Sequence, residues 1–527
     1  MEIFPDFQAF KTAFDAGEPQ VLWTRAPADL ETPVSLMLKL TQAGGDSFLL
    51  ESVTGGEARG RFSIIGWKPD LIWRCQAGNG RDGGTAEVNR SASYDRSAFE
   101  PHGDGALASL REIIAESAID LPADLPPSAA GLFGYLGYDM VRLVEKLPEP
   151  NPDRLGLPDA ILMRPSVVAV VDNAFDTVTL VAPARPTADL SAREAYGRAA
   201  ERLSDAIANL DRPLPGAHSL GGAAPTVAPV SNTDPDDYRD KVERAKEYIR
   251  AGDIFQVVPS QRWSFDFDLP PFALYRALRR TNPSPYMFFF NLAEPEDGEG
   301  CGSFQIAGAS PEILVRVRKE PNPDGGAPIQ KVTLRPIAGT RMRGGTPDED
   351  AALEADLLAD PKELAEHLML LDLGRNDVGR VAKIGTVDPN EQFTIERYSH
   401  VMHIVSNVEG ELSDDHDALS ALLAGMPAGT VSGAPKIRAM EIIDELEADK
   451  RGVYAGGVGF FSASGDMDTC IALRTAVLKD GKVYVQAGGG VVYDSDPEAE
   501  LQETINKSKA LIRAAEEAGR FAAKGNR

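Results

Sequence analysis

Two segments of the chain carry glutamates at the spacing Glu-x-x-Glu. The first pair is Glu363 and Glu366, and the second is Glu500 and Glu503, with Lys507 four residues further on. On a helix, residues three or four apart share a face, so each pair would point one way. Four carboxylates that face one another repel unless a divalent cation neutralises them, and oxygen ligands suit Mg²⁺. The pattern predicts a Mg²⁺ site if the fold joins the two segments, although a single glutamate is usually just an exposed helix residue.

Glycine-rich segments offer a second candidate for ligand binding. Three glycines at residues 488–490 follow a predicted strand and precede the second glutamate pair. Glycines let a backbone approach a ligand closely and present its N–H groups, but a bend in a sheet would use them equally well. Residues 429–436 fail the spacing of a phosphate loop, and Pro435 stands where such a loop needs backbone freedom. Nucleotide binding is therefore not predicted.

Histidine and cysteine give weaker signals. His400 and His403 are close together, but no H-E-x-x-H or C-x-x-C motif accompanies them, so zinc is not predicted. The three cysteines, Cys75, Cys301 and Cys470, are widely separated and suggest no disulfide framework, which fits a reducing compartment. There is no G-x-S-x-G motif for a serine nucleophile.

Composition and charge narrow the class of protein. The chain has 527 residues, of which 43% are hydrophobic, enough for a sizeable core and about two to four domains. Its formal net charge of -26 disfavours nucleic acid as a partner. The sequence shows no signal peptide and no apolar run of the roughly 20 residues that a membrane helix needs. We expect a cytoplasmic protein that binds anions only where local cations or a metal offset its charge.

The chain divides by pattern into four parts. Residues 1–210 mix short strands and helices, residues 211–235 form a linker rich in Pro, Gly, Ala and Ser, residues 236–515 form a C-terminal domain, and residues 516–527 form a tail. Strands occur in blocks between helices and not in regular βαβ alternation. This arrangement favours an α+β fold with large, mostly antiparallel sheets over a doubly wound sheet.

Apolar periodicity and turn residues place the elements. Helices are predicted at residues 107–117, 191–210, 236–251, 361–373, 417–423, 435–446 and 497–517. Strands are predicted at residues 166–172, 177–181, 304–318, 331–341, 457–462, 468–478 and 482–487. The two glutamate pairs therefore lie on helices, each opened by a capping aspartate, Asp360 or Asp496, followed by proline. Asp480 and Gly481 predict a tight turn between the last two strands.

Five motifs along residues 236–514 resemble the chorismate-utilising enzymes, a family that includes anthranilate, aminodeoxychorismate, isochorismate and salicylate synthases. The motifs are PIAGT from Pro336, ELAEHLMLLDLGRND from Glu363, RYSHVMH from Arg397, PAGTVSGAPK from Pro427 and YAGGVG from Tyr454. Gly374 stands where many members have alanine. The resemblance implies a sandwich-like core of mostly antiparallel sheets with helices packed outside, and a Mg²⁺-dependent enzyme that acts on chorismate.

The resemblance also implies roles for the residues at matching positions. Glu366 and Glu503 would hold Mg²⁺, with Glu363 and Glu500 beside them through water, and the metal would grip the ring carboxylate. Arg474 and Tyr454 would clamp the pyruvyl carboxylate, which the fork of an arginine fits well. The remaining substrate-binding positions would be Gly339, Thr340, Gly488, Gly489, Gly490, Val492 and Lys507.

Three further positions match the family's catalytic centre. Glu312 would be the general acid that protonates the departing hydroxyl, which requires a raised pKa. His403 would act in the later elimination step, and Thr430 would complete the pocket. The resemblance therefore implies an amination of chorismate at C2 with loss of the C4 hydroxyl, followed by expulsion of pyruvate.

Two positions distinguish the members of the family. Ala338 stands at the position where aminodeoxychorismate synthases have a lysine that can act as a nucleophile. Gln256 stands at the position where isochorismate and salicylate synthases have a lysine base. Without these lysines, ammonia is left as the nucleophile. The resemblance therefore favours the large subunits of anthranilate synthase, which open tryptophan biosynthesis, with an aminodeoxychorismate synthase subunit as the alternative.

The resemblance extends to regulation and assembly. Two segments resemble the tryptophan feedback site of anthranilate synthases, and an ordinary strand end and a turn are the alternative readings. The residues concerned are Leu50, Glu51, Ser52, Asn282, Pro283, Pro285, Tyr286 and Met287. The chain shows no amidotransferase triad of Cys, His and Glu, so the family pattern implies a separate glutaminase subunit and a heterotetramer of two such pairs.

Overall fold

The computed structural model describes residues 2–41, 45–52, 60–80, 83–214, 227–293, 303–322, 325–398 and 401–522. His400 and Cys301 lie outside the described residues. The N-terminal elements are α1 (Phe7–Asp15), β1 (Gln20–Pro27), α2 (Pro33–Thr41), β2 (Ser47–Glu51), β3 (Phe62–Gln76), β4 (Thr85–Asn89), β5 (Glu100–Pro101), α4 (Ala106–Glu116), η1 (Pro127–Ala129), β6 (Gly131–Leu136), η2 (Tyr138–Leu143), β7 (Ala160–Asp172), β8 (Thr177–Ala184) and α5 (Ala192–Leu210).

The C-terminal part contains more of the elements that carry candidate site residues. They are β9 (Val230–Ser231), α6 (Pro235–Ala251), β10 (Gln256–Val257), β11 (Ser260–Asp266), α7 (Pro271–Thr281), β12 (Tyr286–Ala293), β13 (Ser303–Ser310), β14 (Ile313–Glu320), β15 (Ile329–Leu334), β16 (Ile337–Met342), α8 (Pro347–Ala359), α9 (Pro361–Gly379), β17 (Asp388–Arg397), β18 (Val401–Glu411), α10 (Ala418–Gly425), η3 (Gly429–Val431), β19 (Gly433–Ala434), α11 (Lys436–Leu446), β20 (Gly457–Ser462), β21 (Met467–Ile471), β22 (Thr475–Lys479), β23 (Lys482–Gly488), α12 (Pro497–Glu517) and η4 (Ala518–Arg520).

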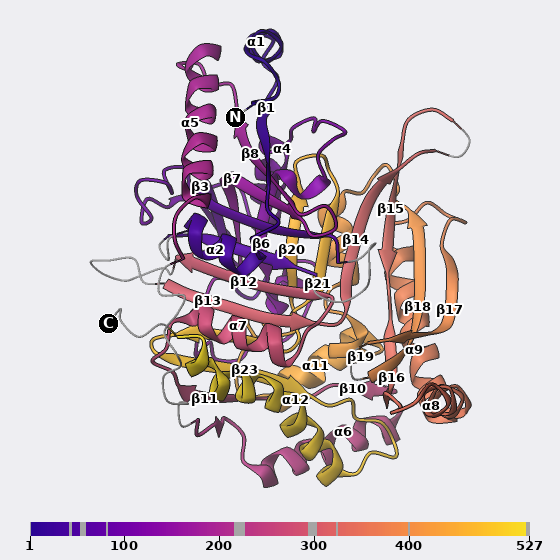
Figure 1. The fold of residues 1–527 in the computed structure, drawn as a ribbon. Coiled ribbons are helices and arrows are strands. Elements are labelled where there is room, and N and C mark those ends of the chain that lie inside the picture. The colour runs from indigo at the N-terminus through magenta and orange to yellow at the C-terminus, as the bar shows by residue number, and fades with distance from the viewer. Residues whose placement is uncertain are drawn as a thin grey trace.

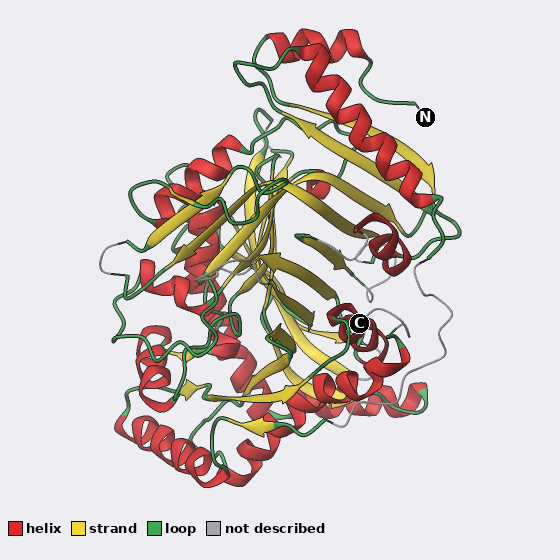
Figure 2. Ribbon diagram, turned by 90° about the vertical axis from the view of Figure 1, so that its left-hand side faces the viewer, coloured by secondary structure: helices red, strands yellow, loops and turns green. Residues whose placement is uncertain are grey.

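The described strands form one sheet of 21 strands and a small sheet of β10 with β19 (Figure 1). The long pairings, such as β3 with β7, β12 with β13 and β11 with β23, are antiparallel. Figure 2 shows the strands in the interior and the helices mainly around them. This arrangement confirms the predicted α+β fold with large, mostly antiparallel sheets.

Strands from both parts of the chain are hydrogen-bonded to each other. β2 pairs with β12, where Leu50 lies opposite Phe288, and β6 pairs with β20, where Gly134 lies opposite Gly459. A Cβ on either of these two glycines would lie 2.0 Å from a carbonyl oxygen. These carbonyls belong to Ile161 of β7 and Asp468 of β21, so glycine lets β6 and β20 approach their other neighbours closely. The apolar core continues across the two parts.

The predicted helices are confirmed, with ends that differ by a few residues. α12 begins and ends where the pattern placed it, and α9 continues to Gly379, beyond the predicted end at residue 373. Asp360 and Asp496 cap these two helices by accepting backbone N–H groups, with proline at the first helical position. Two helices of the C-terminal part, α7 and α8, were not predicted. α8 buries only Asp350 and Leu357, so its sequence has no apolar stripe.

Three predicted strands are wrong in their continuity, because each is divided into two. The strand at 304–318 breaks at Pro311 and the one at 331–341 breaks before Ile337, at Pro336, since proline cannot donate to a strand ladder. The strand at 468–478 breaks at Arg474, whose backbone is left-handed with φ of 47°. The turn at Asp480 and Gly481 has positive φ at both residues, as a two-residue hairpin requires.

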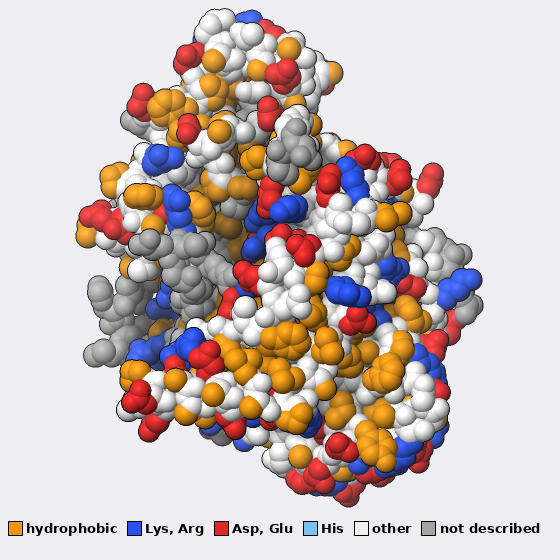
Figure 3. Space-filling view, turned by 90° about the vertical axis from the view of Figure 1, so that its right-hand side faces the viewer, with side chains coloured by type: hydrophobic (Ala, Val, Ile, Leu, Met, Phe, Trp, Pro, Cys, Tyr) orange, Lys and Arg blue, Asp and Glu red, His pale blue; other side chains and the backbone are white. Residues whose placement is uncertain are grey.

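The surface is polar and mixed in charge. Figure 3 shows acidic and basic side chains interspersed over one face, with hydrophobic side chains gathered in its lower half. The net charge of -26 is therefore not concentrated in one patch of that face. Among the helices in the described ranges, none combines the length and apolar character needed to cross a membrane.

Candidate active site

The two glutamate helices face the same glycine loop. This loop follows β23 and contains Gly489 and Gly490. A Cβ on Gly489 would lie 2.9 Å from Glu500 Oε2 of α12. A Cβ on Gly490 would lie 2.7 Å from Nε2 of Gln256, which donates to Glu366 Oε1 of α9 at 3.2 Å. The loop is therefore the point where side chains 134 residues apart in sequence, Glu366 and Glu500, approach one another.

The electrostatics of these carboxylates suit a divalent cation. Burial raises the pKa of both Glu363 and Glu500, and the neighbouring carboxylates of Glu366 and Glu503 add to the shift. Glu500 Oε2 is buried and has no hydrogen-bond partner among the described residues. Within those residues no three acidic, histidine or cysteine side chains form a ready-made metal cluster. An oxygen-only set that is completed by water and substrate fits Mg²⁺, which usually keeps several waters.

Lys507 borders this group of carboxylates. Its Nζ lies 2.7 Å from Glu503 Oε1 and donates to the carbonyl of Gly488 at 3.0 Å. The N–H of Gly489 donates to Pro259 O, and the N–H of Val492 donates to Ser495 Oγ, so the fold itself uses both groups. The structure thus places Val492 beside the loop with its N–H already engaged.

Glu312 lies in the short break between β13 and β14. Its side chain is buried, and its Oε1 accepts a hydrogen bond from Thr430 Oγ1 of η3 at 2.9 Å. Burial raises the pKa of Glu312 to about 8, and the hydrogen bonds from Thr430 and from the backbone of Ile337 oppose that rise. Glu312 therefore carries a proton at neutral pH, as a general acid must.

His403 of β18 connects the PIAGT segment to the rest of the site. Its Nδ1 lies 2.8 Å from the carbonyl oxygen of Gly339 and 3.1 Å from Thr340 Oγ1. Because a carbonyl only accepts, Nδ1 carries the proton and Nε2 keeps its lone pair. Burial lowers the pKa of His403, so the ring is neutral at pH 7. A Cβ on Gly339 would lie 3.3 Å from Glu363 Oε2, which links this segment to α9.

Arg474 and Tyr454 form the remaining side of the site. Arg474 is half-buried between β21 and β22, and within the described residues its guanidinium makes no hydrogen bond or ion pair. Burial lowers its pKa, and its charge in turn lowers the pKa of His403, so the two groups are near each other. Tyr454 is buried, and a Cβ on Gly488 would lie 3.0 Å from its hydroxyl oxygen. A half-buried cation without a counter-ion among the described residues is a fitting partner for a substrate carboxylate.

The predicted residues therefore fall into linked groups. Glu312 contacts Thr430, His403 contacts Gly339 and Thr340, and the glycine loop joins both glutamate helices to Tyr454 and Lys507. Gln256 is the residue that site prediction from sequence missed. The sequence did single out this position, because it distinguishes members of the resembled family. A glutamine alone, however, does not indicate a contact with Glu366, which lies 110 residues away.

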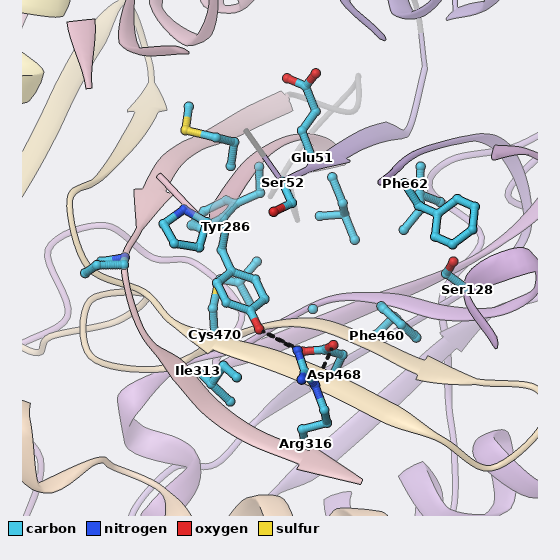
Figure 4. Close-up of a pocket in the computed structure, with 18 of the residues that line it drawn as sticks. Glu51, Ser52, Phe62, Ser128, Tyr286, Ile313, Arg316, Phe460, Asp468 and Cys470 are labelled. Carbon is cyan, nitrogen blue, oxygen red and sulfur yellow. Dashed lines mark hydrogen bonds and ion pairs between the residues drawn. The ribbon is translucent and has the colours of Figure 1, made fainter. Parts of the chain in front are cut away.

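A second cavity, of about 340 Å³, lies between the N-terminal part and the strands β12, β14 and β20 (Figure 4). Six of the eight residues proposed for tryptophan line it, and Asn282 and Pro283 do not. The six are Leu50, Glu51, Ser52, Pro285, Tyr286 and Met287. The volume lies within the roughly 300–1,000 Å³ typical of ligand sites.

The polar groups of this cavity come from strands far apart in sequence. Tyr286 accepts from Arg316 at 2.9 Å, and Arg316 pairs with Asp468 at 3.0 Å. Figure 4 shows the carboxylate of Glu51 pointing away from the other labelled side chains, where its Oε2 accepts from Tyr275 and from Arg279. Arg316 and Asp468 were not predicted, because nothing in the sequence indicates that β14 and β21 are neighbours.

Comparisons with known proteins agree with this geometry. The profile of a family described as chorismate binding enzyme matches residues 68–513. The chain is 65% identical to anthranilate synthase component 1 of Cereibacter sphaeroides over 98% of both chains, and 48% identical to that of Pseudomonas putida over 92% of this chain and 93% of the relative. It superimposes on anthranilate synthase component I from Streptococcus pneumoniae with a TM-score of 0.71 and 36% identity, over 87% of this chain and 94% of that one. The isochorismate synthase MenF from Escherichia coli shares the fold, with a TM-score of 0.64 and 19% identity over 96% and 99% of the two chains.

Proposed function

The chain belongs to the family of chorismate binding enzymes, in the group of anthranilate synthase component 1 proteins, and we propose that it converts chorismate and ammonia into anthranilate, pyruvate and water. This is the first committed step of tryptophan biosynthesis. The observation that carries the proposal is the buried Glu312, whose pKa is raised to about 8 and whose carboxyl accepts from Thr430. The carbonyl of Arg474 accepts from the N–H of Ala309, three residues before Glu312. An aminodeoxychorismate synthase subunit is the alternative, and the absence of a lysine at Ala338 disfavours it.

Substrate binding follows from the cations of the site. Chorismate is a dianion that enters a chain of net charge -26, so its carboxylates need local positive charge. The guanidinium of Arg474 has no competing carboxylate among the described residues and can bind the enolpyruvyl carboxylate with two parallel hydrogen bonds. Tyr454 is proposed as a further hydrogen-bond donor to the same carboxylate. Lys507 adds charge at the glycine loop.

Proton transfer is divided between two residues. The C4 hydroxyl of chorismate leaves as water once Glu312 donates its proton, while ammonia adds at C2. The C2 proton must then be removed as the enolpyruvyl group departs, and the neutral Nε2 of His403 has the lone pair to take part in that step. The hydrogen bond from Thr430 stabilises the carboxylate that Glu312 becomes after it has given its proton away.

We propose Mg²⁺ as the cofactor, held by Glu366 and Glu503 directly and by Glu363 and Glu500 through water. Support comes from the raised pKa values of Glu363 and Glu500 and from the orphaned Glu500 Oε2. When bound, the cation would supply positive charge that orients the ring carboxylate of the substrate.

Glu366→Gln tests the metal proposal. The amide removes one anionic ligand, so we expect the Mg²⁺ concentration at half-maximal activity to rise at least tenfold, and direct Mg²⁺ binding measured by calorimetry to weaken in parallel. Asp372→Asn is the matched control, because Asp372 lies on the same helix with a side chain that is 71% exposed. Equal Mg²⁺ affinity for the wild type and Glu366→Gln would remove Glu366 from the metal site.

The overall reaction is tested with the purified chain, chorismate, Mg²⁺ and ammonium at alkaline pH, where free ammonia is available. Fluorescent anthranilate should form without any partner protein. Accumulation of aminodeoxychorismate in its place would support the alternative function. We further propose that a separate glutaminase subunit supplies the ammonia, in a heterotetramer of two such pairs. If glutamine replaces ammonium in the same assay, the chain alone should form no anthranilate, and adding the glutaminase subunit should restore the reaction. The name "component 1" of the relatives supports such a partner.

We further propose that the enzyme acts in the cytoplasm. Cys75 and Cys470, the cysteines in the described part of the chain, are both free and buried. Unpaired thiols fit a reducing compartment.

The second cavity is proposed as a tryptophan feedback site. Its lining combines the strand end at Ser52 with Pro285 and Met287, an apolar environment for an indole ring, and it reaches Pro311 and Ile313 on either side of Glu312. A ligand there could therefore act on the general acid through its neighbours in the chain.

Ser52→Phe should make the enzyme resistant to tryptophan. The larger side chain would fill part of the 340 Å³ cavity, so the concentration for half-inhibition should rise more than tenfold while kcat without tryptophan stays within about twofold of wild type. Ser91→Phe, an exposed position away from the cavity, is the control. If Ser52→Phe remains fully inhibited, the feedback site lies elsewhere.

A further inference from the structure

A buried ion pair between Glu447 and Arg451 contacts segments that carry candidate site residues. Glu447 is the C-cap of α11 and Arg451 lies four residues further on, with side chains that are 4% and 2% exposed. Arg451 Nε donates to Glu447 Oε2 at 2.9 Å, and its Nη2 donates to Oε1 at 2.6 Å. The steps described above use neither residue.

The remaining donors of Arg451 reach two segments that carry site residues. Its Nη1 donates to the carbonyl of Val431 at 2.7 Å, directly after Thr430 in η3. Its Nη2 donates to the carbonyl of Val258 at 2.7 Å, two residues after Gln256. Both segments are short: Val431 ends η3, which has three residues, and Val258 directly follows β10, whose two residues pair with the two residues of β19.

The carboxylate of Glu447 holds a third segment. Its Oε1 accepts from the backbone N–H and the hydroxyl of Ser260, at 2.8 Å and 2.7 Å, and Ser260 lies opposite Gly488 in the pairing of β11 with β23. The guanidinium of Arg451 also lies 5.4 Å from the ring centroid of Tyr454. One ion pair thus contacts the neighbours of Thr430, Gln256 and Gly488 and the ring of Tyr454 itself.

Stability alone is a poor account of such a pair. Removing two charges from water is costly, and buried ion pairs can often be replaced by apolar residues with little loss of stability. The planar fork of arginine, however, offers several donors in fixed directions, which a lysine cannot reproduce. The segments are also joined directly, since the N–H of Val258 donates to Ser432 O at 3.0 Å and β10 pairs with β19. The donors of Arg451 add a fixed geometry to this short pairing.

We propose that Arg451 is a positioning residue that holds Thr430 against Glu312 and aligns this acid with the glycine loop. The inference rests on the proposed function, because it assigns Glu312 the role of acid. Arg451 touches no reacting atom and acts through Val431, Val258 and Glu447, with the ring of Tyr454 beside its guanidinium.

Arg451→Lys should lower kcat for anthranilate formation by about 10–100-fold, the size of effect that a small misplacement of catalytic groups causes. The KM for chorismate should change less than about threefold, because seven register pairs between β11 and β23 hold the glycine side without help from Arg451. A residue with a merely structural role would lower the melting temperature without this division between kcat and KM.

A double-mutant cycle with Thr430→Val isolates the mechanism. If Arg451 acts through Thr430, the two losses in kcat should not multiply, and the double variant should stay within about threefold of the worse single variant. Arg142→Lys is the matched control. Arg142 is also 2% exposed and pairs with Asp444 of α11, but it contacts no site residue, so its effect should multiply with that of Thr430→Val.

Three results would overturn the inference: a kcat of Arg451→Lys at the wild-type level, a loss confined to KM, or multiplicative losses in the cycle with Thr430→Val. If Arg451→Lys does not fold, Glu447→Gln gives the same comparison, because the amide keeps an acceptor oxygen but loses the charge that holds the fork. A wild type that forms no anthranilate from ammonium would overturn the proposed function itself, whereas an active wild type with a multiplicative cycle overturns the role of Arg451 alone.

Discussion

Glu312→Gln is expected to lower kcat for anthranilate formation by about 10²–10⁴-fold, the range that general acid catalysis contributes. The amide keeps the shape of the side chain and can still accept from Thr430, but it has no acidic proton to give to the C4 hydroxyl. KM for chorismate should therefore stay near the wild-type value. Steady-state kinetics with ammonium measures both kcat and KM.

Glu320→Gln, at the other end of β14, is the control and should be fully active. A Glu312→Gln variant with more than a tenth of the wild-type kcat would show that another group protonates the hydroxyl.

The same carboxyl predicts the pH dependence of the reaction. Burial raises the pKa of Glu312 to about 8, so the acid is protonated below that pH and loses its proton above it. At saturating free ammonia, kcat should therefore fall as the pH rises through about 8, and Glu312→Gln should lack this decline.

The free energy of unfolding should also fall with rising pH. Between pH 4.5 and about 8 the folded state retains a proton on Glu312 that the unfolded chain releases, so this group favours folding less as the pH rises.

Arg474→Ala is expected to raise the KM for chorismate by about 100-fold. Hydrogen bonds to charged groups contribute about 1.5–3 kcal/mol each, and a bidentate clamp on a carboxylate makes two of them. Because Arg474 has no counter-ion among the described residues, its removal should not lower the melting temperature, unlike the loss of a paired buried arginine. Arg474→Lys keeps the charge but not the fork and should give an intermediate KM.

Kinetics and thermal melting separate the possible outcomes for Arg474. An unchanged KM in Arg474→Ala would mean that the enolpyruvyl carboxylate is bound elsewhere. A large fall in melting temperature with an unchanged KM would mean that Arg474 serves the fold, through the left-handed turn at which it divides β21 from β22.

Local features of the fold were predictable from the sequence. The capping aspartate, the following proline and the apolar period of α12 are all contained within neighbouring residues, and the helix begins and ends as predicted. The strand breaks at Pro311 and Pro336 were also readable in principle, because proline disrupts a ladder wherever it stands. The break at Arg474 was not, since a left-handed arginine is uncommon and tertiary contacts impose it.

The meeting of distant segments could not be predicted from periodicity. A helical pattern shows which residues share a face, but not which other face it meets. The path from Glu366 through Gln256 and the glycine loop to Glu500 is therefore visible only in the structure. Resemblance to a family named most of these residues without explaining their contacts. The resemblance also named Asn282 and Pro283. These residues are close in sequence to Pro285, which lines the second cavity, but they do not line it themselves.

The pairing of β2 with β12 and of β6 with β20 has a consequence for how the protein can be divided. The two ladders contribute five and six register pairs across the boundary between the N-terminal and C-terminal parts. If the chain were cut at the linker, β12 and β20 would each present a row of unsatisfied backbone groups, and such open edges recruit strands from other molecules. The N-terminal part therefore also shields the C-terminal part from self-association, and we expect a shortened chain without residues 1–210 to be less soluble.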